Sequence, residues 1–183
     1  MFPRRVWTIV FTVMLVPVIS AAQSPRLVMP NLDHLSKKAT ESVDLALDTS
    51  LLSLAARFLN GSDPDEQSVK EFIGGLKGIY VRSFEFDSDQ AYAAADLEPV
   101  RKQLAGPGWS RLMGVRSRKD TEDVDVYLAL DGSQVQGLVL VAAGARELTI
   151  VNIVGAIDLD RLRKLEGTLG IPRLGLEKKK KDE

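Results

Sequence analysis

The chain contains a single histidine, His34, so any Ser-His-Asp triad or histidine-based metal site would have to use it. It stands among Asn31, Asp33 and Lys37, a composition typical of an exposed polar patch. Residues 108–112, Gly-Trp-Ser-Arg-Leu, match the nucleophile-elbow pattern in their first half only, because a leucine replaces the second glycine. We interpret His34 as a surface residue and predict no catalytic residues.

Carboxylates spaced two residues apart occur as Asp87/Asp89, Asp123/Asp125 and Asp158/Asp160. A calcium-binding loop needs several oxygens that converge on one centre, a glycine that turns the chain and a distant glutamate. None of these pairs is accompanied by such residues in the sequence. The glycines near residue 75 precede a strand and do not join a strand to a helix, so they do not form a phosphate-binding loop. We therefore predict no metal and no cofactor. A glycosidase-like pair of acids that are distant in the chain stays open.

The first 22 residues differ from the rest. Arg4 and Arg5 precede an apolar run from Val6 to Val16, and Ser20-Ala21-Ala22 supplies the small residues that a signal peptidase requires. A permanent membrane anchor needs about 18 apolar residues, which is more than this run provides. The pattern predicts a cleaved signal peptide over residues 1–22 and a periplasmic or secreted protein with no stable membrane anchor.

The remaining chain predicts one domain. We expect a lead-in over residues 23–30, a single domain over 31–174 and a charged, disordered tail over 175–183, in which four consecutive lysines stand between acidic residues. The chain has no cysteine, so its fold depends on the apolar core alone. Its net charge of −1 and the lack of a concentrated basic face exclude the usual nucleic-acid-binding classes.

Apolar periodicity predicts the elements. Val43, Leu45 and Leu47 alternate with polar residues, as in a half-buried strand. Helical spacing predicts a first helix from residue 51, with apolar residues at Leu51, Leu54, Ala55, Phe58 and Leu59. A second helix is expected to begin at Asp63-Pro64 and to end at Gly78 in a left-handed conformation. Its buried stripe would consist of Val69, Phe72, Ile73 and Leu76. The other expected elements are a helical turn within 31–38, strands at 79–86, 111–116, 124–130, 135–142 and 147–154, and a last helix at 159–166. A short helix marked by Leu97, Val100 and Leu104 is expected after the polar loop 87–96.

The order of these elements predicts the fold class. Early helices and a late run of strands favour an α+β fold, with a mainly antiparallel mixed sheet of about 5–6 strands and helices packed on one face. The strands 135–142 and 147–154 are apolar on both sides of the pleat, so we place them at the centre of the sheet. Asp131-Gly132 between two strands predicts a hairpin with a type I′ turn.

Three segments carry a family resemblance. Residues 76–86, residues 107–110 (Pro-Gly-Trp-Ser), and residues 146–155 followed by Asp158-Leu159 resemble an exported bacterial family described as domain of unknown function 4252 (DUF4252). The resemblance extends from about Leu32 to Leu174 and implies export and a single compact domain. It implies no activity and no catalytic residues. Some relatives carry a lipid-anchoring cysteine after the signal peptide, and this chain has Gln23 there.

The sequence favours a non-enzymatic binding or interaction module of the bacterial cell envelope. Two-sided apolar strands and the tyrosines Tyr80, Tyr92 and Tyr127 would suit an envelope protein or a small apolar ligand, and we take these tyrosines as the candidate interaction surface. Two alternatives stay open: a carboxylate-dependent hydrolase acting on envelope polymers, and an accessory protein in envelope stress signalling.

Overall fold

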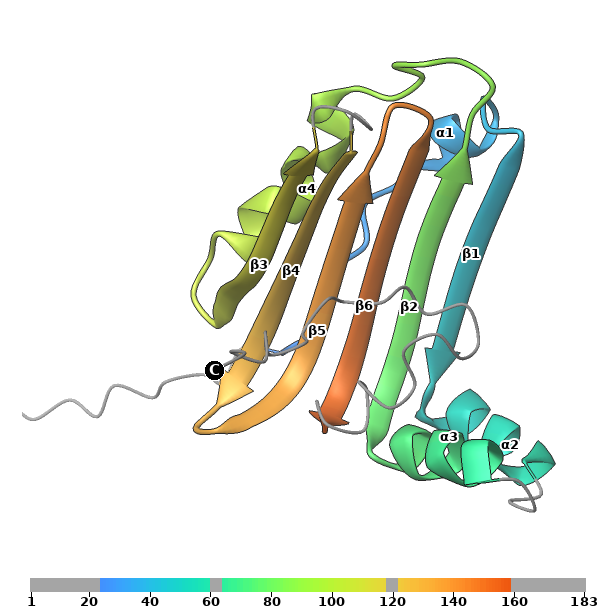
Figure 1. Ribbon diagram of the computed structural model, residues 1–183, viewed down its shortest axis with the longest axis vertical. Coiled ribbons are helices and arrows are strands. Elements are labelled where there is room, and N and C mark those ends of the chain that lie inside the picture. The colour runs from blue at the N-terminus through green and yellow to red at the C-terminus, as the bar shows by residue number, and fades with distance from the viewer. Residues whose placement is uncertain (1–23, 60–63, 118–121, 159–183) are drawn as a thin grey trace, which may run out of the picture.

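The protein folds around one six-stranded antiparallel sheet. The structure, a computed structural model, describes residues 24–59, 64–117 and 122–158. The strands have the spatial order β1-β2-β6-β5-β4-β3, so the last strand in the sequence pairs with β2 on one side and β5 on the other (Figure 1). They are β1 (Glu41–Asp48), β2 (Leu76–Glu85), β3 (Trp109–Ser117), β4 (Glu122–Asp131), β5 (Gln134–Ala143) and β6 (Glu147–Ile157).

Four helices accompany the sheet within the described residues: α1 (Asp33–Ser36), α2 (Thr49–Phe58), α3 (Pro64–Gly74) and α4 (Ala94–Leu104). In Figure 1, α1 and α4 lie behind the sheet, and α2 and α3 lie at the lower end of β1 and β2. The Asp48 side chain starts α2 by accepting a 2.9 Å hydrogen bond from the Leu51 amide. At α4, the Asp96 side chain reaches back to accept from the Ala93 amide at 2.8 Å.

Both faces of the sheet carry apolar side chains. The face that we call the α4 face bears Phe84, Val139 and Ile150, which pack with the buried residues of α4 and with Leu27, Leu32 and Leu35. The other face, which we call the opposite face, bears Leu138 and Val126, and these form a second cluster with Leu52 of α2 and Phe72 of α3. Alternation along each strand separates the two sets of residues.

The α+β class and the expected strands are confirmed. β5 and β6, which are apolar on both sides, lie at the centre of the sheet as their pattern predicts. Val43, Leu45 and Leu47 of β1 share one face, but this strand is not half-buried as expected, because Val43 and Leu45 are exposed at the edge of the sheet. The helices divide between the faces: α1 and α4 pack on the α4 face, whereas the buried residues of α2 and α3 join the cluster on the opposite face. The helix expected at 159–166, the signal peptide and the charged tail lie outside the described residues.

The turn between β4 and β5 differs from the expected type I′ turn. Asp131 pairs with Gln134, so the two central residues are Gly132 and Ser133. Gly132 alone of these has a positive φ, of 59°, which is the geometry of a type II′ turn with glycine in its first central position. Asp131 is the last residue of β4 and keeps a negative φ, because the strand continues one residue further than its apolar pattern shows.

The junction between α3 and β2 also differs from the expectation. Leu76 begins β2 and does not extend the helical stripe, and Gly78 is a strand residue without the left-handed φ of a helix cap. A bulge between Leu76 and Gly78 shifts the register against β6 at this point. The chain therefore passes from helix to strand about three residues earlier than the β-branched residues alone indicate.

Candidate interaction surfaces

The α4 face is closed by the chain's own N-terminal segment. Asn152 of β6 is fully buried, and its Oδ1 accepts from the Leu27 amide at 2.8 Å. Its Nδ2 donates to the carbonyls of Pro25 and Leu138, each at 3.2 Å. One central side chain thus holds residues 24–30 against the sheet, and this face is a filled core.

The three tyrosines lie on or beside this closed face and are not brought together. Tyr80 of β2 is half-buried under the Arg26 guanidinium, which lies 4.5 Å from the ring centroid, and it lines a hollow of about 540 Å³ with Asp44 and Arg82. Tyr127 of β4 is half-buried and packs against the α4-face cluster. Two strands separate Tyr80 from Tyr127 in the sheet.

Tyr92 lies before α4, in a second hollow of about 530 Å³ that Arg101 and Asp123 also line. Its hydroxyl donates to the Gly144 carbonyl at 2.5 Å, and its ring packs on Phe86. Burial, assisted by the Asp123 carboxylate, raises the pKa of Tyr92. A hydroxyl held in this way fixes the loop before α4, so Tyr92 has a structural task. An interaction role for the three tyrosines stays a prediction.

α2 presents its apolar stripe to solvent. Leu51, Leu54 and Phe58 are 45%, 48% and 77% exposed, whereas the buried residue of this helix is Leu52. The periodicity correctly predicts an amphipathic helix but not the direction in which its apolar side points. A helix that exposes three large apolar side chains at positions i, i+3 and i+7 is typical of an interaction surface.

β1 extends this surface along the edge of the sheet. Val43 and Leu45 are exposed on the opposite face, and α2 contacts both β1 and β2. β1 is a terminal strand of the sheet, and no strand among the described residues pairs with its outer side. Its outer edge therefore offers backbone donors and acceptors beside an apolar helix, which is an arrangement that can receive a partner strand.

The upper end of the opposite face is acidic. Glu41, Glu85 and Glu147 are cross-strand neighbours on β1, β2 and β6. Glu85 and Glu147 also line a hollow of about 610 Å³ together with Glu122 and Arg146. Like charges directly opposite one another on adjacent strands repel and destabilise the sheet. Cationic groups placed beside this row of glutamates would offset that repulsion.

Asp125 forms the most connected ion pair on the α4 face. It accepts hydrogen bonds from Arg111 and from Arg116, whose Nη2 lies 2.9 Å from Oδ2. Burial raises the pKa of Asp125, but the hydrogen bonds from Arg116 and Arg111 outweigh it, so the net shift is downward. Of the spaced carboxylates, Asp123 and Asp125 thus serve to join β3 to β4.

Replacing Asp125 with asparagine is expected to weaken the pH dependence of stability. Because its pKa is lower in the folded state, the carboxylate contributes stability above its unfolded pKa and loses it as the pH falls through the folded value. The difference in unfolding free energy between wild type and Asp125→Asn should be about 1 kcal/mol near pH 6 and should shrink towards pH 3. Urea unfolding at both pH values measures it, with Asp131→Asn at an exposed turn as the control. A difference that stays constant with pH would contradict the assignment.

Neither a metal site nor a histidine-based site is found in the part of the chain that the structure describes. Among those residues, no three histidine or acidic side chains gather closely enough to hold a metal ion. His34 is exposed on α1, and its Nε2 lies 3.0 Å from the Asp96 carboxylate. Over the same residues, no helix combines the length and the hydropathy needed to span a bilayer.

Comparison with known proteins gives one result. The family model described as Domain of unknown function (DUF4252) matches residues 36–165, which is more than half of the chain and includes every strand of the sheet. No match is found among curated proteins or among solved structures. The matched range begins just before β1 and ends beyond β6, so the sheet is what the family model describes. The chain belongs to the family known as Domain of unknown function (DUF4252).

Proposed function

We propose that this protein is an exported, non-enzymatic binding module of the bacterial cell envelope, and that α2 and β1 receive a protein partner. The observation that carries the proposal is the stripe of Leu51, Leu54 and Phe58, which is apolar and faces solvent. Burying such a stripe against a partner would contribute about 25 cal/mol per Å² of apolar area. The burial of these three large side chains would therefore favour association with a partner.

A protein partner fits this surface better than a small apolar ligand does. The hollow beside β1 is mixed in character, with Arg26, Asp44 and Arg82 among its lining residues. The outer edge of β1 offers backbone hydrogen-bonding groups, which another polypeptide strand can match and a lipid cannot. The exposed helix and the strand edge adjoin, so one partner can use both.

The hydrolase alternative has one observation in its favour, the glutamates that share the hollow at the upper end of the sheet. A carboxylate pair that works as acid and base needs one member shielded from water. Glu85, Glu122 and Glu147 are all exposed. The same glutamates are better explained by the charge balance of the sheet, as argued below.

A photo-crosslinking amino acid placed at Phe58 tests the binding surface in living cells. We expect a discrete adduct of higher mass from position 58, because this side chain is the most exposed of the stripe. The matched control carries the same group at Ser53, which is exposed on another side of α2. Adding Leu54→Asp to the Phe58 variant should abolish the adduct, since a charge in the stripe opposes apolar contact.

Fractionation of the same cells tests export. The adduct should be found in the envelope fraction, and the mass of the purified protein should correspond to a chain that starts near Gln23. Equal adducts from positions 58 and 53, or none from either, would contradict the binding surface. A mature protein that retains Met1 would contradict export alone.

A further inference from the structure

The opposite face is apolar well beyond the reach of α2 and α3. Val126 and Leu128 of β4 and Leu138 of β5 are only 2%, 6% and 5% exposed. Yet the two helices whose residues join this cluster lie beside β1 and β2, at one end of the sheet (Figure 1). Further apolar residues of this face on β5 and β6 include Leu140, Val151 and Ile153. Something other than the described helices has to cover the middle of this face.

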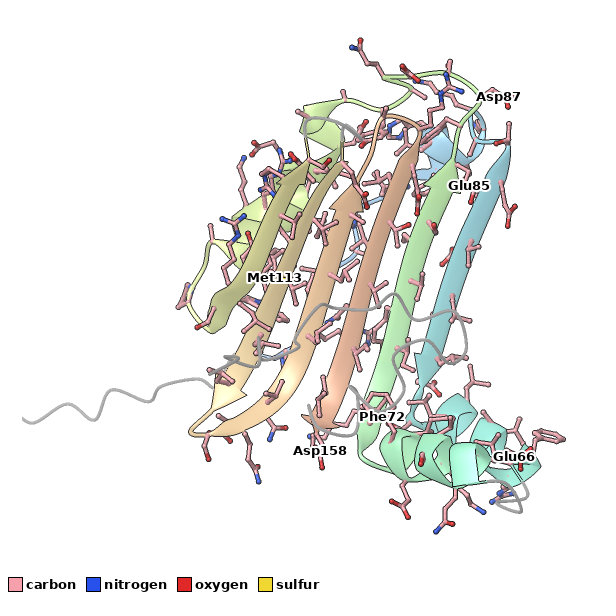
Figure 2. All side chains as sticks on the ribbon, in the orientation of Figure 1. Glu66, Phe72, Glu85, Asp87, Met113 and Asp158 are labelled. Atoms are coloured by element: carbon pink, nitrogen blue, oxygen red, sulfur yellow. The ribbon has the colours of Figure 1, made fainter. Side chains whose placement is uncertain are left out.

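The chain leaves the sheet at the place where such a cover would begin. Ile157, the last residue of β6, is buried in the cluster of the opposite face, and Asp158 follows it at the lower end of the sheet near Phe72 (Figure 2). The next residues carry leucines at 159, 162 and 165, a spacing that puts them on one side of a short helix. Further apolar residues follow as Leu169, Ile171, Leu174 and Leu176.

The charges at the far end match as well. Lys178–Lys181 is a run of four lysines that follows the apolar residues after one intervening glutamate, Glu177. The row of Glu41, Glu85 and Glu147 lies on the opposite face, at the end of the sheet away from Asp158, where Figure 2 labels Glu85. The segment is apolar first and cationic next, and the opposite face is apolar first and anionic next in the same direction, so the two are complementary.

The length of the segment fits this path. From Ile157 back to Glu147, β6 spans about 33 Å at 3.3 Å per residue. A helix over residues 159–166 advances about 12 Å, and residues 167–177 reach up to about 36 Å when extended. Gly167, Gly170 and Pro172 end such a helix and favour an extended continuation. The lysines can therefore reach the glutamates with the chain to spare.

We propose that residues 159–176 lie along the opposite face over β4, β5 and β6, and that Lys178–Lys181 pair with the glutamates Glu41, Glu85 and Glu147. The segment completes the second core of the protein and supplies cations to the glutamate row, which has no ion pair with any residue that the structure describes. The occupant of this face is thus the chain's own C-terminal segment. The stripe of α2 lies outside this path and stays available to a partner.

Engineered disulfides test this arrangement in the full chain, because the protein has no cysteine of its own. Lys179→Cys is combined with Val43→Cys, an exposed position on the opposite face two residues from Glu41. The matched control combines Lys179→Cys with Ser42→Cys, which is exposed on the same strand but points to the α4 face. Under mild oxidation, we expect the intramolecular disulfide to form at least about tenfold faster with position 43, since docking raises the effective concentration of the two thiols.

Salt and molecular mass complete the test. The rate at position 43 should fall several-fold between low and high ionic strength, because the lysine–glutamate pairs are exposed and screened. Equal rates at positions 42 and 43 would overturn the proposal, and a rate that does not respond to salt would overturn the lysine–glutamate pairing. A disulfide-linked dimer in place of the intramolecular product would show that a second copy covers the face, which also overturns it.

Discussion

Gly155→Ala is expected to lower the free energy of unfolding by about 3–5 kcal/mol, from backbone strain and from overpacking together. Gly155 has a φ of +132°, which side chains rarely allow. A Cβ atom there would lie 2.6 Å from the Gly75 carbonyl oxygen and 2.6 Å from the Leu76 Cα. Both neighbours are backbone atoms at the bulge where β2 meets β6, so neither can move aside cheaply. Chemical denaturation followed by circular dichroism measures the loss.

Two other glycines separate these causes. Gly132 has a φ of +59° but open space where a Cβ would lie, so Gly132→Ala should show strain alone, about 1–2 kcal/mol. Gly74 has open space and no positive φ, so Gly74→Ala should cause no loss. If Gly155→Ala lowers the free energy of unfolding no more than Gly132→Ala does, the close approach of the two backbones at Gly155 does not contribute to stability as proposed.

Asn152→Ala is expected to cost about 3 kcal/mol, because a buried donor or acceptor left without a partner costs about 1–3 kcal/mol. The substitution leaves the Leu27 amide without its acceptor, and the carbonyls of Pro25 and Leu138 lose a donor. It also frees residues 24–30 from the sheet. Hydrogen exchange at the Leu27 amide should therefore accelerate strongly, in addition to the loss seen in urea unfolding.

An exposed asparagine provides the control for Asn152. Asn31 also accepts a hydrogen bond from a backbone amide, that of Asp33 at 3.0 Å, but water can replace it there. Asn31→Ala should change the free energy of unfolding by less than about 1 kcal/mol. Similar losses for the two variants, with Leu27 exchange unchanged, would show that Asn152 does not hold the N-terminal segment in place.

Local patterns predict most of the elements of this fold. The two-sided apolar composition of β5 and β6 reflects burial and leads to their correct central placement. The two-residue period of β1 correctly predicts a strand with one apolar side, but Val43 and Leu45 on that side are exposed and not half-buried. A pattern does not reveal which neighbour an apolar side meets, and α2 illustrates this limit: its stripe is amphipathic, yet it faces solvent while Leu52 is buried. Likewise, Asp131-Gly132 marks a turn, but the strand pairing decides which two residues form it.

The residues that matter most to the core were visible in the sequence as exceptions. Asn152 is an amide in an otherwise apolar central strand, and such a residue needs buried partners that the chain supplies 125 and 127 residues away. Gly155 follows the expected strand 147–154 directly, and the structure places it inside β6, where an isolated glycine accompanies a bulge or a close backbone approach. Their partners come from distant segments, so the sequence alone indicates an unusual position but not its contacts.

The central place of β6 has a consequence for how the molecule assembles. A polypeptide emerges N-terminus first, and by the time residue 146 is available only two separate blocks can exist, β1 with β2 and the meander β3–β4–β5. One edge of β2 and one edge of β5 stay unpaired until β6 is available, because β6 pairs with both of these strands. The complete sheet therefore cannot form before β6 is available, and a chain threaded through a narrow pore could complete its sheet only after residue 157 had passed.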